Sequence, residues 1–265
     1  MGNGDVEAEW RAILTGQHKG MLALRRQFRS LPSAPRCKLC YAPFHGVAGT
    51  LLRPWFGPWP RNPQLCKNCM TQLMKQGVGG AEVEISMLFA DIRGSTGLGE
   101  RLRPAEFSAL LGAFYRLAAK AIVDTDGIVD KFVGDEAIGL FVTAYSGTAH
   151  AAKAVAAGRA LLAAVSQADA STSGPIPVGG GVQTGVAFVG TLGSSAEISD
   201  FTALGDAVNT TARLASLAGP GELLISAASV EHASLDVSGL EHRSVEVRGR
   251  EAGLDVYAWH APGAE

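Results

Sequence analysis

The chain has 265 residues, of which 47% are hydrophobic, so it can bury a substantial core as one large domain or as a domain with an appendage. Its formal net charge of −2 excludes the strongly basic composition that is typical of nucleic-acid-binding domains. Neither a membrane-spanning apolar run nor a secretion signal is found in the sequence. We therefore expect a cytoplasmic protein that has no nucleic acid and no membrane among its partners.

The first segment, residues 1–36, has the spacing of an amphipathic helix. Met21, Leu24, Phe28 and Leu31 fall on one stripe of such a helix. A single apolar stripe is typical of a helix that packs against a neighbour. We predict a helical segment here that packs on the rest of the chain or forms a dimer.

Residues 37–76 differ in composition and contain all four cysteines of the chain. They form two pairs, Cys37 with Cys40 and Cys66 with Cys69, each with a two-residue spacer. Two such pairs complete a closed tetrahedral site, which favours a structural Zn²⁺; an iron–sulfur cluster and free thiols are the alternatives. Between the pairs, the many prolines, tryptophans and glycines predict little regular structure.

The remaining stretch, residues 82–260, alternates apolar strands with Ala-rich helices. We predict the following elements: a strand near 83–90, a helix near 104–124, a hairpin over 127–142 that turns at Gly134 and Asp135, a helix near 146–168, strands near 177–190 and 199–204, a helix near 206–218, a strand at 222–226 and a hairpin near 240–259. This order, with hairpins between helices, predicts an α/β (α+β) fold with a ferredoxin-like βαββαβ sandwich rather than a doubly wound parallel sheet.

Two aspartates stand at the turn ends of apolar strands. Asp91 follows the run MLFA, and Asp135 lies in VGDEAIGLF at the predicted hairpin turn. Placed side by side by a sheet, the two carboxylates would hold divalent cations against a triphosphate. Each segment alone also fits an ordinary turn residue, so a third segment is needed to support a site.

That third segment is GDAVNTTARL, in which Asn209 and Arg213 are four residues apart on a predicted helix and so share one face. Together with FADIRGST, DKFVGDEAIGLF and GVQTGVAFVGTLG, it resembles the class III nucleotidyl cyclases, and the four segments follow that family's order. The resemblance covers about residues 82–260. It implies a head-to-tail homodimer whose two active sites are each built from both chains.

The resemblance also implies a role for individual residues. Asp91 and Asp135, with the Ile92 carbonyl, match the family's ligands for two Mg²⁺ or Mn²⁺ ions. Asn209 matches the residue that orients the ribose, and Arg213 matches the arginine that stabilises the pentavalent phosphorus.

Three further positions concern the nucleotide. Lys131 matches the base-recognition lysine, Thr202 matches the second base-recognition residue, and Arg250 takes the place of a triphosphate-binding lysine. Many members have aspartate where Thr202 stands, and guanine-specific members usually have an acidic residue at the lysine position. The pair Lys131 and Thr202 therefore favours ATP, with 3′,5′-cyclic AMP and pyrophosphate as products.

Several alternatives to an adenylate cyclase stay open. They are a guanylate cyclase, a catalytically silent cyclase-like domain that senses nucleotides, and a diguanylate cyclase of the GGDEF type. The last is suggested by VGDEAIGLF, but that segment lacks the second glycine and the phenylalanine of the motif, and this family would not account for GDAVNTTAR. The silent domain is disfavoured because Asp91, Asp135 and Arg213 are all present.

Overall fold

The computed structural model describes residues 3–32, 35–60, 62–75, 79–168, 175–193, 199–246 and 253–262. The chain forms two compact units. The first unit contains residues 1–83, 142–147 and 187–204, and the second unit contains residues 84–141, 148–186 and 205–265. Among the described residues, no helix is long and apolar enough to cross a membrane.

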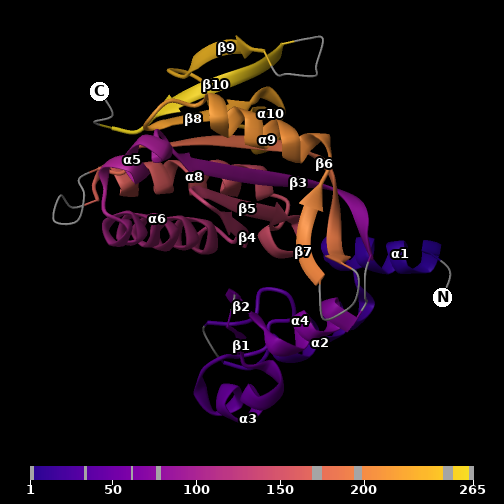
Figure 1. The fold of residues 1–265 in the computed structure, drawn as a ribbon. Helices are drawn as coiled ribbons and strands as arrows, with labels where there is room; N and C mark the ends of the chain where they lie inside the picture. Colours follow the sequence, from indigo (N-terminus) through magenta and orange to yellow (C-terminus); the bar gives the residue numbers. More distant parts are fainter. Residues whose placement is uncertain are drawn as a thin grey trace. The chain divides into compact units, whose positions relative to one another are not determined.

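The core of the fold is a βαββαβ arrangement with the sheet order β4-β5-β3-β6 (Figure 1). Its elements are β3 (Gly79–Ile92), α6 (Pro104–Asp124), β4 (Ile128–Val133), β5 (Glu136–Val142), α8 (His150–Ser166) and β6 (Val178–Gly193). The predicted ferredoxin-like sandwich is confirmed, and so are the helix over 104–124 and the hairpin that turns at Gly134 and Asp135.

Three more strands extend the sheet beyond β6 in the order β8-β10-β9. These strands are β8 (Glu222–Ser226), β9 (Glu241–Val245) and β10 (Leu254–His260). Strand β8 is parallel to β6, whereas β10 is antiparallel to both β8 and β9. The predicted strand and the predicted C-terminal hairpin are thus present.

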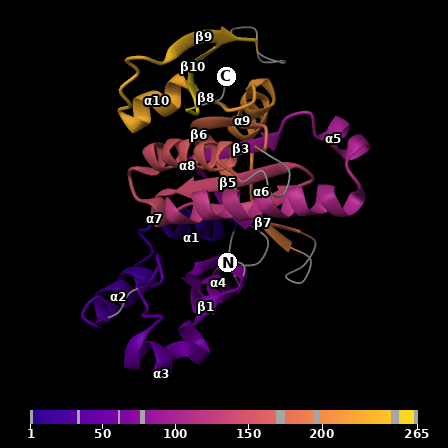
Figure 2. The same cartoon turned by 90° about the vertical axis from the view of Figure 1, so that its left-hand side faces the viewer.

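The sheet of the second unit buries apolar side chains on both faces. On one face, α6 and α8 pack against the sheet (Figure 2), with Phe114 and Leu161 fully buried there. Successive residues of a strand point to opposite faces, and β8 shows this directly. Leu223 belongs to the cluster under α6 and α8, whereas Leu224 packs with Leu214 of α9 (Asp206–Leu217) on the other face. Helix α9 is therefore fixed by its own buried face.

Three short helices were not predicted from the sequence: α5 (Ser95–Arg101), α7 (Thr143–Ser146) and α10 (Ala227–Ala233). Each has seven residues or fewer, which is too short to show a helical period. The last of them has a recognisable start, because Ser226 caps its first turn by accepting a hydrogen bond from the Ser229 N–H.

The N-terminal segment forms two helices instead of one, α1 (Asn3–Leu14) and α2 (Lys19–Phe28). The break lies at Gly16, whose φ of 76° is in the left-handed region. The side chain of His18 then caps α2 by accepting a hydrogen bond from the Met21 N–H. Met21 and Phe28, two residues of the predicted apolar stripe, are buried.

The segment between the cysteine pairs is more regular than the sequence indicated. It contains α3 (Gly46–Phe56) and the two-stranded sheet of β1 (Pro58–Trp59) and β2 (Asn62–Cys66), and α4 (Lys67–Lys75) follows directly and includes Cys69. The prediction of little regular structure was therefore wrong. Pro54 does not prevent α3 from forming, because it lies in the last turn and the helix ends two residues later.

Within the first unit, the start of β3 packs closely against β6. A Cβ atom added at Gly190 would lie 2.2 Å from the Gly79 carbonyl oxygen and 2.4 Å from the Gly80 Cα. Because backbone atoms cannot rotate away, we expect Gly190→Ala to lower the free energy of unfolding by about 1–3 kcal/mol in urea denaturation. Gly4→Ala, where nothing lies within 4 Å, is the matched control. Equal stability of both variants would contradict this packing.

Candidate functional site

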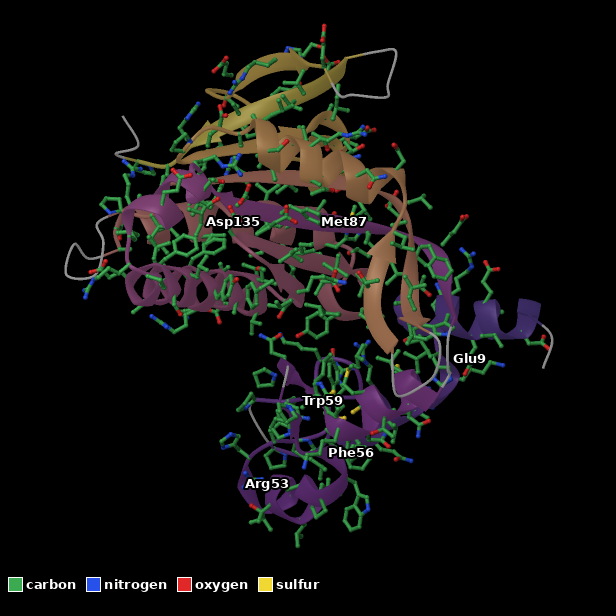
Figure 3. The ribbon with its side chains drawn as sticks, viewed as in Figure 1. Glu9, Arg53, Phe56, Trp59, Met87 and Asp135 are labelled. Carbon is green, nitrogen blue, oxygen red and sulfur yellow. The ribbon has the colours of Figure 1, made fainter. Side chains whose placement is uncertain are left out.

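The two predicted metal-binding aspartates lie side by side in the second unit. Asp91 lies near the end of β3, and Asp135 lies in the turn between β4 and β5, where Figure 3 labels it. The backbone joins the two segments, since the Ile92 N–H donates to the Asp135 carbonyl at 3.2 Å. The sheet therefore brings together two residues that are 44 positions apart in the sequence.

One of the two oxygens of the Asp91 carboxylate forms an ion pair. One oxygen, Oδ2, pairs with the Arg93 guanidinium, whose Nε also donates to the Asp91 carbonyl at 3.3 Å. The other oxygen, Oδ1, is buried, and no described group hydrogen-bonds to it. Burial raises the pKa of Asp91 to about 6, and the neighbouring Asp135 adds to this rise.

The carboxylates of Asp135 and Glu136 interact with that of Asp91, and their pKa values are shifted as well. Burial alone would raise the pKa of Asp135, but hydrogen bonds with Ser95 and Asp91 outweigh it and hold the pKa below its ordinary value. Burial and the charges of Asp91 and Asp135 raise the pKa of Glu136 to about 7. Crowded carboxylates with an unmatched buried oxygen are a donor set that suits hard divalent cations such as Mg²⁺ and Mn²⁺.

Helix α9 presents the predicted ribose and phosphate residues. Asn209 is exposed and Arg213 is half-buried, while Thr210, Thr211 and Leu214 are buried beneath them. The two predicted residues thus lie on the side of α9 that does not pack on the sheet.

The C-terminal end of α9 is attached to the Asp91 turn. The Nη1 atom of Arg93 donates to the Ser216 carbonyl at 3.0 Å, while its Nη2 atom pairs with Asp91. Arg93 and Ser95 were not among the predicted site residues. The only sequence signal for them is their position two and four residues after Asp91.

The base-recognition residues lie on two strands. Lys131 is on β4 opposite Ile138, and its Nζ is 4.0 Å from Oδ2 of the buried Asp130. Thr202 is buried on β7 (Ser199–Leu204) opposite Gly190. Lys131 belongs to the second unit and Thr202 to the first. Arg250 lies outside the described residues.

The four cysteines meet in the first unit. All are buried, and their sulfur atoms lie within 4.8 Å of one another. The Sγ atoms of Cys37 and Cys69 are 3.9 Å apart, and those of Cys40 and Cys66 are 3.6 Å apart. Around a tetrahedral Zn²⁺ with Zn–S bonds of 2.3 Å, neighbouring sulfurs would be about 3.8 Å apart. The cluster therefore has the dimensions of a four-sulfur metal site.

Local backbone geometry supports this cluster. Tyr41 adopts a left-handed conformation with φ of 63°, and its N–H donates to the Cys37 carbonyl at 2.9 Å. Backbone N–H groups also reach the sulfurs, since Cys66 N lies 3.3 Å from Cys37 Sγ. Hydrogen bonds from the Cys40 and Cys66 thiols lower the pKa of Cys37 far below its usual range, so at least one thiolate is favoured here.

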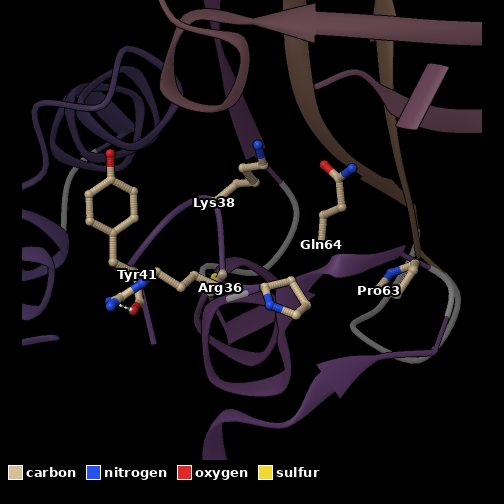
Figure 4. A pocket seen from close by; sticks show the side chains of 7 residues that line it. Arg36, Lys38, Tyr41, Pro63 and Gln64 are labelled. Carbon is tan, nitrogen blue, oxygen red and sulfur yellow. Dashed lines mark hydrogen bonds between the residues drawn. The ribbon is translucent and has the colours of Figure 1, made fainter. Parts of the chain in front are cut away.

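A cavity of about 660 Å³ opens beside the cysteine cluster (Figure 4). Its lining residues are Pro35, Arg36, Cys37, Lys38, Tyr41, Pro63 and Gln64. Two polar side chains of this wall form hydrogen bonds within the first unit. Arg36 donates to the Phe28 carbonyl at 2.7 Å, and Gln64 Oε1 accepts from the Tyr145 hydroxyl at 2.6 Å. We assign no ligand to this cavity.

Residues 80–260 match the family model of the adenylate and guanylate cyclase catalytic domain. The chain belongs to this family. An uncharacterized protein of Mycobacterium bovis is 33% identical to the cyclase chain over 159 residues, covering 59% of this chain and 28% of that protein. The adenylate cyclase of Anabaena cylindrica is 33% identical over 153 residues, covering 54% of this chain and 30% of that enzyme. The cyclase chain thus matches less than a third of the length of these curated relatives.

Solved cyclase structures share the fold of this domain. The guanylyl cyclase Cya2 is similar with a TM-score of 0.62 and 29% identity, over 68% of this chain and 93% of that one. The adenylyl cyclase CyaB from P. aeruginosa has a TM-score of 0.59 and 26% identity, over 69% of this chain and 97% of that one. Residues 80–260 are therefore a nucleotide cyclase catalytic domain, and the relatives include enzymes of both base specificities.

Proposed function

We propose that the protein is an adenylate cyclase that converts ATP to 3′,5′-cyclic AMP and pyrophosphate at the interface of a homodimer. The observation that carries the proposal is the pair Asp91 and Asp135, which adjoin at the end of the sheet and leave a buried Asp91 oxygen unmatched. The adenylate cyclase of Anabaena cylindrica supports the choice of reaction, while the guanylyl cyclase Cya2 represents the alternative substrate.

The choice of ATP rests on the chemistry of Lys131 and Thr202. Adenine offers an amino group as a donor and a ring nitrogen as an acceptor, whereas guanine offers a carbonyl acceptor and a ring N–H donor. A lysine can only donate, so it suits the adenine acceptor, and a threonine hydroxyl can accept from the adenine amino group. A guanine N–H would face the lysine with no acceptor.

Each proposed catalytic residue has a separate task. Asp91 and Asp135 hold two Mg²⁺ or Mn²⁺ ions, with the Ile92 carbonyl as a further ligand. When bound, these ions lower the pKa of the ribose 3′-hydroxyl and neutralise the leaving pyrophosphate. Asn209 holds the ribose so that its 3′-oxygen is in line with the α-phosphorus. Arg213 stabilises the negative charge that develops there, and Arg250 binds the triphosphate.

The proposal extends to the organisation of the chain. Residues 1–36 form a helical segment, residues 37–76 form a module held by a structural Zn²⁺ at Cys37, Cys40, Cys66 and Cys69, and residues 82–260 form the cytoplasmic catalytic domain. Zinc is favoured over an iron–sulfur cluster because the sulfur spacing fits one tetrahedral ion.

The direct test of the reaction is to incubate the protein with Mn²⁺ and either ATP or GTP and to separate the products by chromatography. Cyclic AMP from ATP is the expected result. Cyclic GMP as the main product would support a guanylate cyclase, and cyclic di-GMP would support a diguanylate cyclase. No turnover by a folded dimer would support the silent domain.

Base selection has its own prediction. Lys131→Glu is expected to shift the ratio of kcat/KM for ATP over GTP by about 10- to 100-fold toward GTP, because the carboxylate accepts from the guanine N–H and not from adenine. Lys120→Glu, at an exposed lysine of α6, is the matched control and should leave the ratio unchanged. An equal loss with both nucleotides would show that Lys131 does not read the base.

A further inference from the structure

The charge of the chain is divided very unevenly. From Trp10 to Ala81 there is no aspartate or glutamate, although the chain has 25 of them in total. The same stretch contains eleven lysines and arginines: Arg11, Lys19, Arg25, Arg26, Arg29, Arg36, Lys38, Arg53, Arg61, Lys67 and Lys75. The net charge of −2 therefore conceals a strongly basic N-terminal stretch and an acidic remainder.

Helix α3, in the middle of this stretch, exposes a stripe of large apolar side chains. Val47, Leu51 and Trp55 have 81%, 70% and 65% of their surface exposed. They are spaced by four residues, so they spread over only about 80° of the helix circumference. Large apolar side chains are normally exposed singly rather than in a row, and a row of them marks a contact surface.

The opposite side of α3 is fixed within the first unit. Gly49 is buried, and the ring of Phe56 packs edge-to-face against Phe28 of α2, with centroids 5.1 Å apart. Figure 3 labels Arg53 and Phe56 on this helix. Because the inner side of α3 is anchored, rotation of the helix would not bury the stripe.

The same unit also exposes several cations. Arg53 is exposed on α3 itself, about 160° around the helix from Leu51, and Lys67 is exposed on α4, which packs against α3. Arg26 on α2 and Arg29, which caps the C-terminal end of α2, are exposed as well. By contrast, Arg25 is engaged inside the unit, where it donates to the Leu39 carbonyl at 2.6 Å.

These features select one kind of partner. Self-association through the stripes of two copies would bring two basic stretches together, which charge repulsion opposes. A nucleic acid would match the cations but would leave the apolar stripe without a contact. An anionic lipid surface matches both, because tryptophan and leucine insert at the headgroup boundary while lysine and arginine bind the lipid charges.

We propose that the first unit docks on anionic membranes, with Val47, Leu51 and Trp55 of α3 inserted at the headgroup level and the exposed arginines and lysines of the same unit on the lipid charges. This departs from the expectation of no membrane partner, which rested on the lack of a membrane-spanning apolar run. The proposal does not depend on which nucleotide the catalytic domain uses.

The test is sedimentation of the full metal-loaded chain with vesicles of phosphatidylcholine alone or with about 30 mol% phosphatidylglycerol. We expect binding to the anionic vesicles only, weakened when NaCl is raised from about 0.1 to 0.5 M. Leu51→Ser combined with Trp55→Ser should lower the partition coefficient at least about tenfold. Arg26→Glu combined with Arg29→Glu should lower it about tenfold.

The controls separate docking from misfolding. Val186→Ser removes an apolar side chain of similar exposure, 59%, from the second unit and should bind like the wild type. Metal content and circular dichroism of every variant should match the wild type, and Trp55→Phe should retain most of the binding. The tryptophan emission of the chain, which has four tryptophans, should also shift to the blue on anionic vesicles, and Trp55→Phe should remove most of this shift.

Three outcomes would overturn the proposal. They are absence of binding to both kinds of vesicle, equal binding to neutral and anionic vesicles, and wild-type binding by the Leu51→Ser, Trp55→Ser variant. A change of that variant's oligomeric state in the absence of lipid would assign the stripe to a protein interface and would also overturn it.

Discussion

Chains with Asp91→Ala and chains with Arg213→Ala should each be inactive alone and should regain activity when mixed. Each change should lower kcat by at least about 10²–10³-fold, because it removes a charge needed at the reacting phosphate. In a head-to-tail homodimer, a mixed dimer has one site with both defects and one intact site. Random mixing should therefore restore about a quarter of the wild-type rate.

The measurement is the rate of cyclic AMP formation as a function of the mixing ratio, which should peak at equal amounts. Mixing either variant with Asp124→Ala, an exposed aspartate of α6, is the control and should dilute the wild-type-like activity linearly. Mixed dimers that form but remain inactive would show that Asp91 and Arg213 serve the same site in one chain.

Replacing Cys66 by serine is expected to remove the bound metal and to unfold the segment from Cys37 to Cys69. Three sulfurs bind zinc far more weakly than four, and in small zinc modules the binding free energy of roughly 10–16 kcal/mol is the folding free energy. The metal content should fall from one ion per chain to nearly none by elemental analysis. The helical signal of α3 and α4 should be lost from the far-ultraviolet circular dichroism.

Lys67→Ser changes the exposed residue next to Cys66 and is the matched control, which should keep the metal. Removal of zinc from the wild type by a strong chelator should reproduce the Cys66→Ser spectrum, and added Zn²⁺ should reverse it. Visible absorption and iron in the purified protein would indicate a cluster instead. A metal-free chain with an unchanged spectrum would show that packing alone holds the module.

Most of the catalytic fold is predictable from local sequence patterns. The helix over 104–124 and the hairpin with its turn at Gly134 and Asp135 were predicted at the positions where they occur. Both depend on periods of apolar residues and on turn residues, which are local signals. The adjacency of Asp91 and Asp135 followed from the expected sheet, because both residues end strands of the same core.

Other features depend on contacts that a local pattern does not contain. The division of the first segment at Gly16 and the helix α3 with Pro54 in its last turn were missed, since a proline or glycine predicts a break without saying where the chain resumes. The pairing of Arg93 with Asp91 depends on the turn geometry after β3. The exposed stripe of α3 is visible only once the buried side of that helix is known.

The guanidinium of Arg93 contacts two different parts of the proposed machinery. Its Nη2 atom pairs with Asp91. Its Nη1 atom donates to the Ser216 carbonyl at the end of α9, the helix that carries Asn209 and Arg213. In the proposed dimer, Asp91 serves one active site and α9 of the same chain serves the other. A single guanidinium then links the two sites, so nucleotide and metal binding at one would alter the second, and ATP saturation would be cooperative.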